Sequence, residues 1–210
     1  MAAPLYPSLV NLFTAFEREF EQIPDTRKKL LADLAEFVQT KVNSNTSAQL
    51  IFICTHNSRR SHLSQIWAQT AAAYYGIAPV QSFSGGTEAT AFNPRAVKAM
   101  QQVGFQITTS NPAATNPLYE IRIGEHVPVM TAFSKVYDAP DNPATDFCAV
   151  MTCSHADENC PYIPGASKRV PLTYNDPKEF DDTPLEAAKY TERLLEIGRD
   201  LAYAFSLIKP

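Results

Sequence analysis

The stretch FICTHNSRRSHLSQIW, residues 52 to 67, changes from apolar residues to a short polar and basic segment and then to a helix-like pattern. Residues 50 to 53 form a continuous apolar run, which is typical of a strand covered on both faces in a parallel sheet. After the polar segment, residues that fit one helix face recur at spacings of three and four, namely Leu63, Ile66, Trp67, Thr70 and Tyr74. Gly76 then follows as a helix stop. The order of strand, tight polar loop and helix predicts an α/β fold with its site at the loop.

The rest of the chain from residue 48 continues the alternation of strands and helices. Residues 80–84 are expected to form a strand, with a turn at 84–87 and a helix between Asn93-Pro94 and Gly104. Further strands are expected at 147–152 and 169–172, and a hairpin around Gly124-Glu125. Thr183 and Glu186 have capping-box spacing and predict the start of a closing helix. These elements predict an α/β sandwich with a mostly parallel sheet.

The first 47 residues have a different pattern. Between residues 8 and 42, apolar side chains recur at helical spacing in two runs separated by Pro24-Asp25. This indicates a helical hairpin, followed by the polar connector 43–47. We therefore divide the chain into an N-terminal helical extension, residues 1–47, and an α/β domain, residues 48–210.

Composition excludes several classes of protein. The 210 residues are 45% hydrophobic and 19% charged, which describes an ordinary globular chain. A formal net charge of −4 argues against a general nucleic-acid or membrane-surface binder. No window approaches the ~20 apolar residues of a membrane span, and no basic segment precedes the first apolar residues, so a cytoplasmic location is expected. In a reducing compartment the four cysteines are more readily core, metal-binding or catalytic thiols than disulfides.

The loop from Cys54 to Ser61 has the composition of an oxyanion site. Short polar residues between a strand and a helix let backbone N–H groups converge, and the helix dipole adds positive potential. Arg60 can offer a planar two-donor fork to a tetrahedral oxyanion. Cys54 would then be a thiolate at neutral pH, and Ser61 could donate a hydrogen bond to it.

The segment Cys54-Thr-His-Asn-Ser-Arg-Arg60-Ser61 resembles the C-x5-R-[ST] loop of the low-molecular-weight protein tyrosine phosphatase superfamily, which includes the thioredoxin-coupled arsenate reductases. The resemblance continues through 83–88, 93–100 and 175–177, and covers roughly residues 48 to 208. It implies a flavodoxin-like three-layer sandwich with a four-stranded, mostly parallel sheet. It also implies that Cys54 is the nucleophile, Arg60 the oxyanion clamp and Asp176 the general acid. The oxyanion would be bound by the loop residues, namely Thr55, His56, Asn57, Ser58, Arg59 and Arg60.

A second segment favours reduction over hydrolysis. Residues 150–161 resemble the redox segment of the thioredoxin-coupled reductases, with Cys153 and Cys160 at the same spacing. The resemblance implies that Cys54 attacks arsenate, that Cys153 attacks Cys54 and releases arsenite, and that Cys160 then attacks Cys153. An external dithiol such as thioredoxin would reduce the final disulfide. Residues seven apart on an intact helix lie ~10 Å apart, whereas disulfide Cα atoms must come within ~7 Å, so we expect the segment to unwind on oxidation. Cys148 is expected to be a core thiol.

The chain departs from the family pattern at three places. Arg59 and His56 stand where these families commonly have cysteine and glycine, which predicts a bulkier and more cationic loop rim. Gln65 replaces a glutamate that helps bind potassium in some reductases, which weakens the expectation of a potassium site. Lys178-Glu179-Phe180 replaces the paired aromatic residues of many tyrosine phosphatases. No bound cofactor is expected, and no metal either, because Cys153, His155 and Cys160 lack a fourth zinc ligand. His62 is expected to have an ordinary structural role.

Three functions remain open from the sequence. The first is an arsenate reductase, and the second is a phosphomonoester phosphatase that acts on a phosphorylated protein through a phosphocysteine. The third is a sensor of oxyanions or redox state. Its partner surface would be the N-terminal stripe Leu9, Phe13, Phe16 and Phe20, which could instead pack on the α/β domain or form a homodimer.

Overall fold

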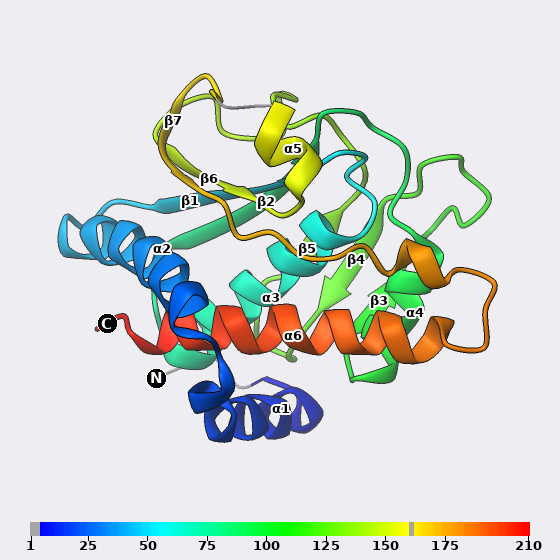
Figure 1. Ribbon diagram of the computed structural model, residues 1–210, viewed down its shortest axis with the longest axis horizontal. Coiled ribbons are helices and arrows are strands. Elements are labelled where there is room, and N and C mark those ends of the chain that lie inside the picture. The colour runs from blue at the N-terminus through cyan, green and yellow to red at the C-terminus, as the bar shows by residue number, and fades with distance from the viewer. Residues whose placement is uncertain (1–4, 160–161) are drawn as a thin grey trace.

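A four-stranded parallel sheet forms the centre of the molecule (Figure 1). The computed structural model describes residues 5–159 and 162–210. The sheet has the order β2-β1-β6-β7, with β1 at Ala48–Cys54, β2 at Val80–Gly86, β6 at Phe147–Met151 and β7 at Ala166–Val170. Helices α3 (Arg60–Tyr75), α4 (Pro94–Gln102) and α6 (Glu186–Ser206) follow β1, β2 and β7 along the chain. The predicted α/β class and parallel sheet are confirmed.

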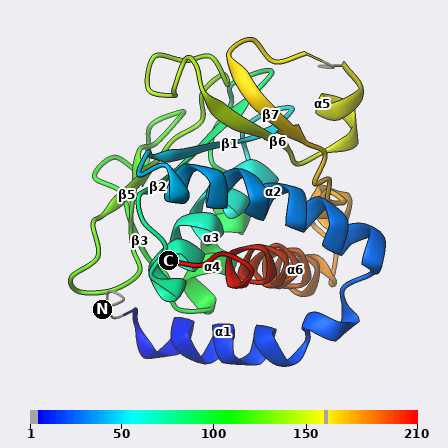
Figure 2. The same ribbon diagram turned by 90° about the vertical axis from the view of Figure 1, so that its left-hand side faces the viewer.

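Both faces of the sheet are buried, as the apolar run in β1 predicts. Alternate residues of the strand belong to different apolar clusters, because successive side chains of a strand point to opposite faces. Leu50 and Phe52 pack in the larger cluster, which contains the helices α2, α3 and α6. Ile51 and Ile53 pack in the smaller cluster beneath α5 (Ser154–Asn159). In Figure 2 the long helices lie on one side of the sheet, whereas α5 and loops lie on the other.

The N-terminal helices are α1, Pro7–Arg18, and α2, Asp25–Asn43, joined by a short 3-10 helix at Phe20–Gln22. The two predicted N-terminal helices are confirmed, and Figure 2 shows that α6 lies between them, with α2 beside the sheet and α1 on the far side of α6. Aromatic packing explains the separation. Phe13 and Phe16 contact the Trp67 ring of α3 at centroid distances of 5.8 and 5.5 Å. Most of the N-terminal apolar stripe is therefore covered by the same chain.

A second, antiparallel sheet of order β3-β4-β5 lies beside α4, with β3 at Gln106–Thr108, β4 at Tyr119–Arg122 and β5 at Met130–Ala132. The pairing of β4 with β5 confirms the hairpin expected around Gly124-Glu125. The third strand, β3, was not expected from the sequence. It is three residues long with only its middle residue buried, so it carries too little periodicity to be detected.

Element boundaries differ most from expectation at β7 and at the start of α6. The strand expected at 169–172 is β7, which begins and ends earlier. Helix α6 begins at Glu186 rather than after Thr183, because the expected capping box does not form. The Glu186 carboxylate accepts from the backbone N–H of Asp182 and from Arg95 instead of from Thr183.

Within residues 5–159 and 162–210, no helix combines the length and apolarity needed to cross a membrane.

Candidate active site

The loop between β1 and α3 is fixed from outside by the end of β2. The carbonyls of Cys54 and Thr55 accept from the backbone N–H groups of Thr87 and Glu88, at 3.1 and 2.8 Å. A Cβ atom on Gly86 would lie 2.7 Å from Thr55 O, which explains why glycine is needed at this close approach. These two carbonyls are bound by residues outside the loop. The N–H groups of residues 55–58, in contrast, donate to no acceptor in the described part of the chain. They stand at the start of α3, where backbone donors and the helix dipole favour an anion.

Cys54, at the carboxyl end of β1, is 3% exposed and contacts the first turn of α3. Its Sγ lies 3.1 Å from the Ser61 hydroxyl. Asn57 also binds the Ser61 hydroxyl. The Asn57 side-chain oxygen accepts from Lys135 N at 2.8 Å, which directs its NH₂ group to donate to Ser61 Oγ at 2.9 Å. Among the described residues the Ser61 hydroxyl has no acceptor other than the Cys54 sulfur, so it donates to that sulfur when Cys54 is a thiolate.

Asn57 itself is fully buried and has a left-handed backbone with φ of 43°. Asn tolerates this conformation better than most residues. The conformation turns the loop tightly enough for both ends of the Asn57 side chain to be satisfied within it. Asn57 therefore contributes to the site through orientation, in addition to its backbone N–H.

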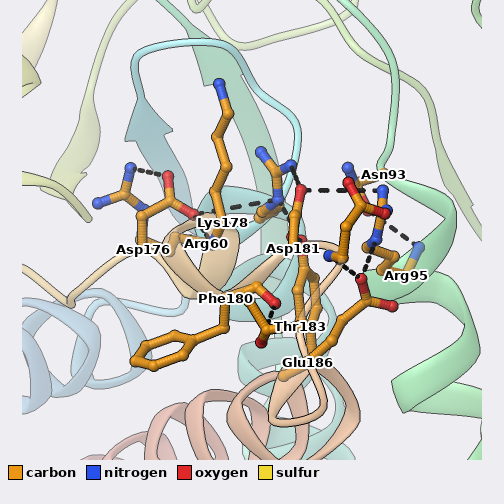
Figure 3. Close-up of polar contacts among 12 residues, drawn as sticks. Arg60, Asn93, Arg95, Asp176, Lys178, Phe180, Asp181, Thr183 and Glu186 are labelled. Carbon is orange, nitrogen blue, oxygen red and sulfur yellow. Dashed lines mark hydrogen bonds and ion pairs between the residues drawn. The ribbon is translucent and has the colours of Figure 1, made fainter.

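Arg60 and Asp176 meet at the mouth of the loop (Figure 3). Arg60 donates to the Tyr174 carbonyl at 2.9 Å and to Asp176 Oδ2 at 2.7 Å. Its Nε is buried and has no partner among the described residues, so the guanidinium retains donor capacity. Asp176 also accepts from Lys178 N at 3.1 Å and caps the 3-10 helix η2, Pro177–Phe180. This cap fixes the Asp176 carboxyl group above the loop.

Arg59 lies beside Arg60 in the chain, but its guanidinium is directed to another set of groups. It donates to the Tyr190 hydroxyl at 2.7 Å and to Asp181 at 3.1 Å. Its Nε is 4.0 Å from Asp176. The Tyr190 hydroxyl in turn donates to Asp181 at 2.7 Å, so the three groups form a closed ring of hydrogen bonds.

The ion-pair network continues away from the loop to Arg95 on α4 (Figure 3). Arg95 pairs with Asp182 at 2.6 Å and Glu186 at 2.7 Å, and lies 3.8 Å from Asp181. The network joins the segment after η2 to α4 and α6. It stabilises the position of the segment that carries Asp176.

His56 and Ser58 complete the loop. The His56 ring is half exposed and lies 3.6 Å from the Glu88 carboxylate. Its carbonyl accepts from the hydroxyls of Thr90 and Ser134. Ser58 accepts through its carbonyl from Asn93 N, the residue that caps α4. The loop backbone is thus attached to β2, α4 and the segment that follows β5.

Cys153 lies next to the loop, on the smaller apolar cluster that also contains Cys54. It is 1% exposed, and its Sγ is 3.5 Å from the Thr55 hydroxyl and accepts from Ala156 N at 3.4 Å. The Thr55 hydroxyl also lies 3.3 Å from His155 Nδ1. Cys54 and Cys153 thus belong to one buried cluster, and Cys153 contacts the residue that follows Cys54 in the chain. Cys160 and Pro161 lie outside the described residues.

Cys148 and His62, which follows Ser61 in the chain, are both buried. Cys148 is fully buried in β6, and burial raises the pKa of its thiol to about 12. His62 is fully buried, its Nδ1 is 3.1 Å from the Ser84 hydroxyl, and its ring stacks on Phe92. Burial, together with the nearby Lys135 charge, lowers the pKa of His62 to about 3. Among the described residues, no group of three or more His, Cys, Asp or Glu side chains is placed to bind a metal ion.

Four residues at the site were not expected from the sequence: Tyr174 through its carbonyl, Lys135 through its N–H, and Asp181 with Tyr190 through Arg59. The two backbone contacts leave no trace in residue identity. Asp181 follows Asp176 closely and could have been considered, because two arginines in the loop call for more than one acidic partner.

The fold and the site together define a class of protein. The sheet is parallel with the order β2-β1-β6-β7, and a buried cysteine and an arginine lie on a strand-to-helix loop. Solved structures agree on the fold. A low-molecular-weight phosphotyrosine phosphatase from Vibrio cholerae O395 superposes with a TM-score of 0.50 at 14% identity, covering 76% of this chain and 94% of that one. A low-molecular-weight protein tyrosine phosphatase from T. tengcongensis gives a TM-score of 0.51 at 17% identity, covering 77% and 99%. The fold is that of the low-molecular-weight phosphatases.

Sequence relatives narrow the class to a family. A protein named arsenate reductase from Bacillus cereus (strain 03BB102) is 30% identical over 154 residues, which are 71% of this chain and 95% of the relative. Arsenate reductase 2 from Staphylococcus epidermidis is 31% identical over 130 residues, or 61% and 77% of the two chains. No model of a known protein family matches the chain. The chain belongs to the arsenate reductase family.

Proposed function

We propose that the protein reduces arsenate to arsenite, with Cys54 as nucleophile and Cys153 as the thiol that resolves its adduct. The observation that carries this proposal is the shared neighbourhood of the two sulfurs. Cys54 is held by Ser61 at 3.1 Å, and Cys153 is 3.5 Å from the hydroxyl of the next residue, Thr55. A phosphatase needs only the first of these cysteines. The names of the arsenate reductase relatives support the same choice.

The first step forms a bond between sulfur and arsenic. Arsenate occupies the loop, where the N–H groups of residues 55–58 and the Arg60 guanidinium bind its oxygens. The Cys54 thiolate attacks As(V), and one arsenate oxygen leaves as water after it accepts a proton from the Asp176 carboxyl group. The Ser61 hydroxyl hydrogen-bonds the sulfur while it carries negative charge.

The second step transfers two electrons. The Cys153 thiolate attacks the Cys54 sulfur, so the S–S bond forms as the S–As bond breaks. The electron pair of the S–As bond goes to arsenic, which leaves as arsenite, As(III). Cys153 Sγ accepts a hydrogen bond from Ala156 N at 3.4 Å, which fixes the position of the attacking sulfur at the start of α5.

The third step restores Cys54. Cys160 attacks Cys153 and leaves a Cys153–Cys160 disulfide, which an external dithiol such as thioredoxin reduces in the cytoplasm. Helix α5 lies between the two cysteines and must unwind for their Cα atoms to approach within ~7 Å. The proposal therefore includes a loss of α5 on oxidation.

Arg59 has a supporting part in this scheme. Its guanidinium is engaged by Tyr190 and Asp181, so its side chain holds the Asp176 segment instead of contacting the oxyanion. His56 is the exposed side chain of the loop, beside the Glu88 carboxylate. Residues 48–210 carry the chemistry, and residues 1–47 form an N-terminal extension.

The test uses the purified protein with arsenate, thioredoxin and thioredoxin reductase, and measures arsenite released. Cys54→Ser, Cys153→Ser and Cys160→Ser are each expected to stop turnover, and Cys148→Ser serves as the matched control that does not. A phosphatase would instead hydrolyse p-nitrophenyl phosphate in a Cys54-dependent manner, insensitive to Cys153→Ser and Cys160→Ser, and would release no arsenite. That result would refute the proposal.

A further inference from the structure

One side chain of the N-terminal extension reaches the segment that carries Asp176. Arg27 lies in the first turn of α2, outside the residues that carry the resemblance to the reductases. Its guanidinium is largely buried between α2 and α6, with 17% of the side chain exposed. Such burial of an arginine is unfavourable unless its donors are satisfied, so the identity of its partners matters.

The Arg27 guanidinium makes three contacts, and its buried Nη2 has no hydrogen-bond partner among the described residues. Its Nε donates to Asp200 Oδ2 of α6 at 2.9 Å, and its Nη1 donates to the carbonyl of Thr173 at 2.8 Å. The Cζ atom of Arg27 lies 4.3 Å from the centroid of the Tyr174 ring, so the guanidinium stacks over that ring. Asp200 is 2% exposed, so its hydrogen bond with Arg27 is shielded from water. Arg27 therefore links α6 to residues 173–174.

Arg60 of the catalytic loop also binds residues 173–174. The carbonyl of Tyr174 accepts from Arg60 Nη1 at 2.9 Å, and Tyr174 N donates to Thr152 O at 3.1 Å. Consecutive carbonyls of one segment are thus bound by Arg27 and by Arg60. Two residues further on, Asp176 binds the same Arg60 guanidinium at 2.7 Å.

We propose that Arg27 is a positioning residue for the oxyanion site, which it orients through the Thr173–Tyr174 backbone that holds Arg60 and leads to Asp176. This inference rests on the proposed function of Arg60 as the oxyanion clamp. It assigns to the N-terminal extension a part in substrate binding, in addition to its part in the core. A planar fork is required, because Arg27 binds Asp200 and a backbone carbonyl at the same time.

Packing alone does not account for arginine at this position. Leu31, Leu34 and Val38 already bury the apolar face of α2. An apolar residue at position 27, matched by one at 200, would stabilise the helix interface as well as a buried ion pair does, and often better. Arg27 instead donates a hydrogen bond to the carbonyl of Thr173, in the segment before Asp176, which an apolar residue cannot do.

The test separates positioning from stability. Arg27→Met alone would leave the Asp200 charge buried and unpaired, so the main variant is the double substitution Arg27→Met with Asp200→Asn, which removes both charges. Arg27→Lys keeps a charge for Asp200 but lacks the fork. Val38→Ala is the control, because it weakens the packing of the same helix about 16 Å along its axis from Arg27. Melting temperature is measured for every variant.

Two readouts follow the oxyanion site. The first is protection of Cys54 from iodoacetamide by inorganic phosphate, and the second is kcat and KM for arsenate. For the double variant we expect half-protection to require roughly tenfold more phosphate, and kcat/KM to fall by roughly tenfold to a hundredfold, at a melting temperature no lower than that of Val38→Ala. Arg27→Lys is expected to be intermediate. Val38→Ala is expected to bind phosphate as the wild type does.

Wild-type phosphate protection in both Arg27 variants would overturn the inference. So would a loss of protection in Val38→Ala equal to that of the double variant, since the effect would then follow stability. If the double variant does not fold, Arg27→Lys decides by the same criterion. A wild-type protein that is protected by phosphate but releases no arsenite would instead refute the proposed reductase activity, while the phosphate titration would still test Arg27.

Discussion

Replacing Asn57 tests the orientation of the Ser61 hydroxyl. Asn57→Ala removes the hydrogen bonds to Ser61 and from Lys135, which contribute about 0.5–1.5 kcal/mol each. Alanine at a φ of 43° adds strain of about 1–2 kcal/mol. The sum is a destabilisation of about 2–5 kcal/mol, or a fall in Tm of roughly 4–20 °C for a chain of this length.

Asn57→Gly is the matched control, because it removes the same hydrogen bonds without the left-handed strain. Glycine gains about 0.5–1 kcal/mol of freedom in the unfolded chain, so the glycine variant should be about 0.5–1 kcal/mol more stable than the alanine variant. Both variants should lose kcat for arsenate to the same extent. A hydrogen bond to a charged sulfur is worth about 1.5–3 kcal/mol, which corresponds to roughly tenfold to a hundredfold.

The assay is arsenate turnover with thioredoxin and its reductase, together with thermal unfolding. Wild-type kcat in both variants would refute the role of Asn57 in orienting the Ser61 hydroxyl. A glycine variant that is less stable than the alanine variant would refute the argument from backbone conformation.

Three further substitutions test the surroundings of the site. Gly86→Ala places a Cβ 2.7 Å from the Thr55 carbonyl, so the loop must move, and phosphate protection of Cys54 in an iodoacetamide titration should be lost. Cys148→Ala should keep wild-type turnover, and in the wild type this thiol should not react with a disulfide reagent at pH 8 in the folded state, because burial raises its pKa to about 12. His62 has a folded pKa of about 3, below its unfolded value of about 6.5, so the unfolded state binds more protons between these values. Stability should therefore fall, by up to roughly 5 kcal/mol, as the pH drops from 6.5 to 3, and His62→Gln should flatten this dependence in urea unfolding experiments.

The central α/β unit could be predicted because its signals are local. The apolar run of β1, the αL stop at Gly76 with φ of 68°, and the Asn93 side chain that accepts from Arg95 N each depend on a few neighbouring residues. The start of α6 could not be predicted. The Glu186 carboxylate is shared with Arg95, which is 91 residues away in the chain. The separation of α1 and α2 likewise depends on tertiary partners, in particular Trp67.

The site shows the same division between local and distant information. The spacing of Cys54 and Arg60 placed both on one loop, and the structure shows the Ser61 contact expected for it. The C-x5-R spacing distinguishes Arg60 from Arg59, but only the fold shows that Arg59 binds Tyr190 and that Arg60 binds the Asp176 segment. Backbone partners such as the Tyr174 carbonyl carry no sequence signal, and Arg27 is distant from the loop in the chain.

The most direct test of the account is a single turnover of the Cys160→Ser variant. Reduced protein is mixed with arsenate without a dithiol, quenched in acid, alkylated and mapped by peptide mass spectrometry. The account predicts one arsenite and one Cys54–Cys153 disulfide per protein molecule, and neither product in Cys54→Ser/Cys160→Ser. Arsenite released without that disulfide, or no arsenite from a variant that still binds phosphate, would contradict it.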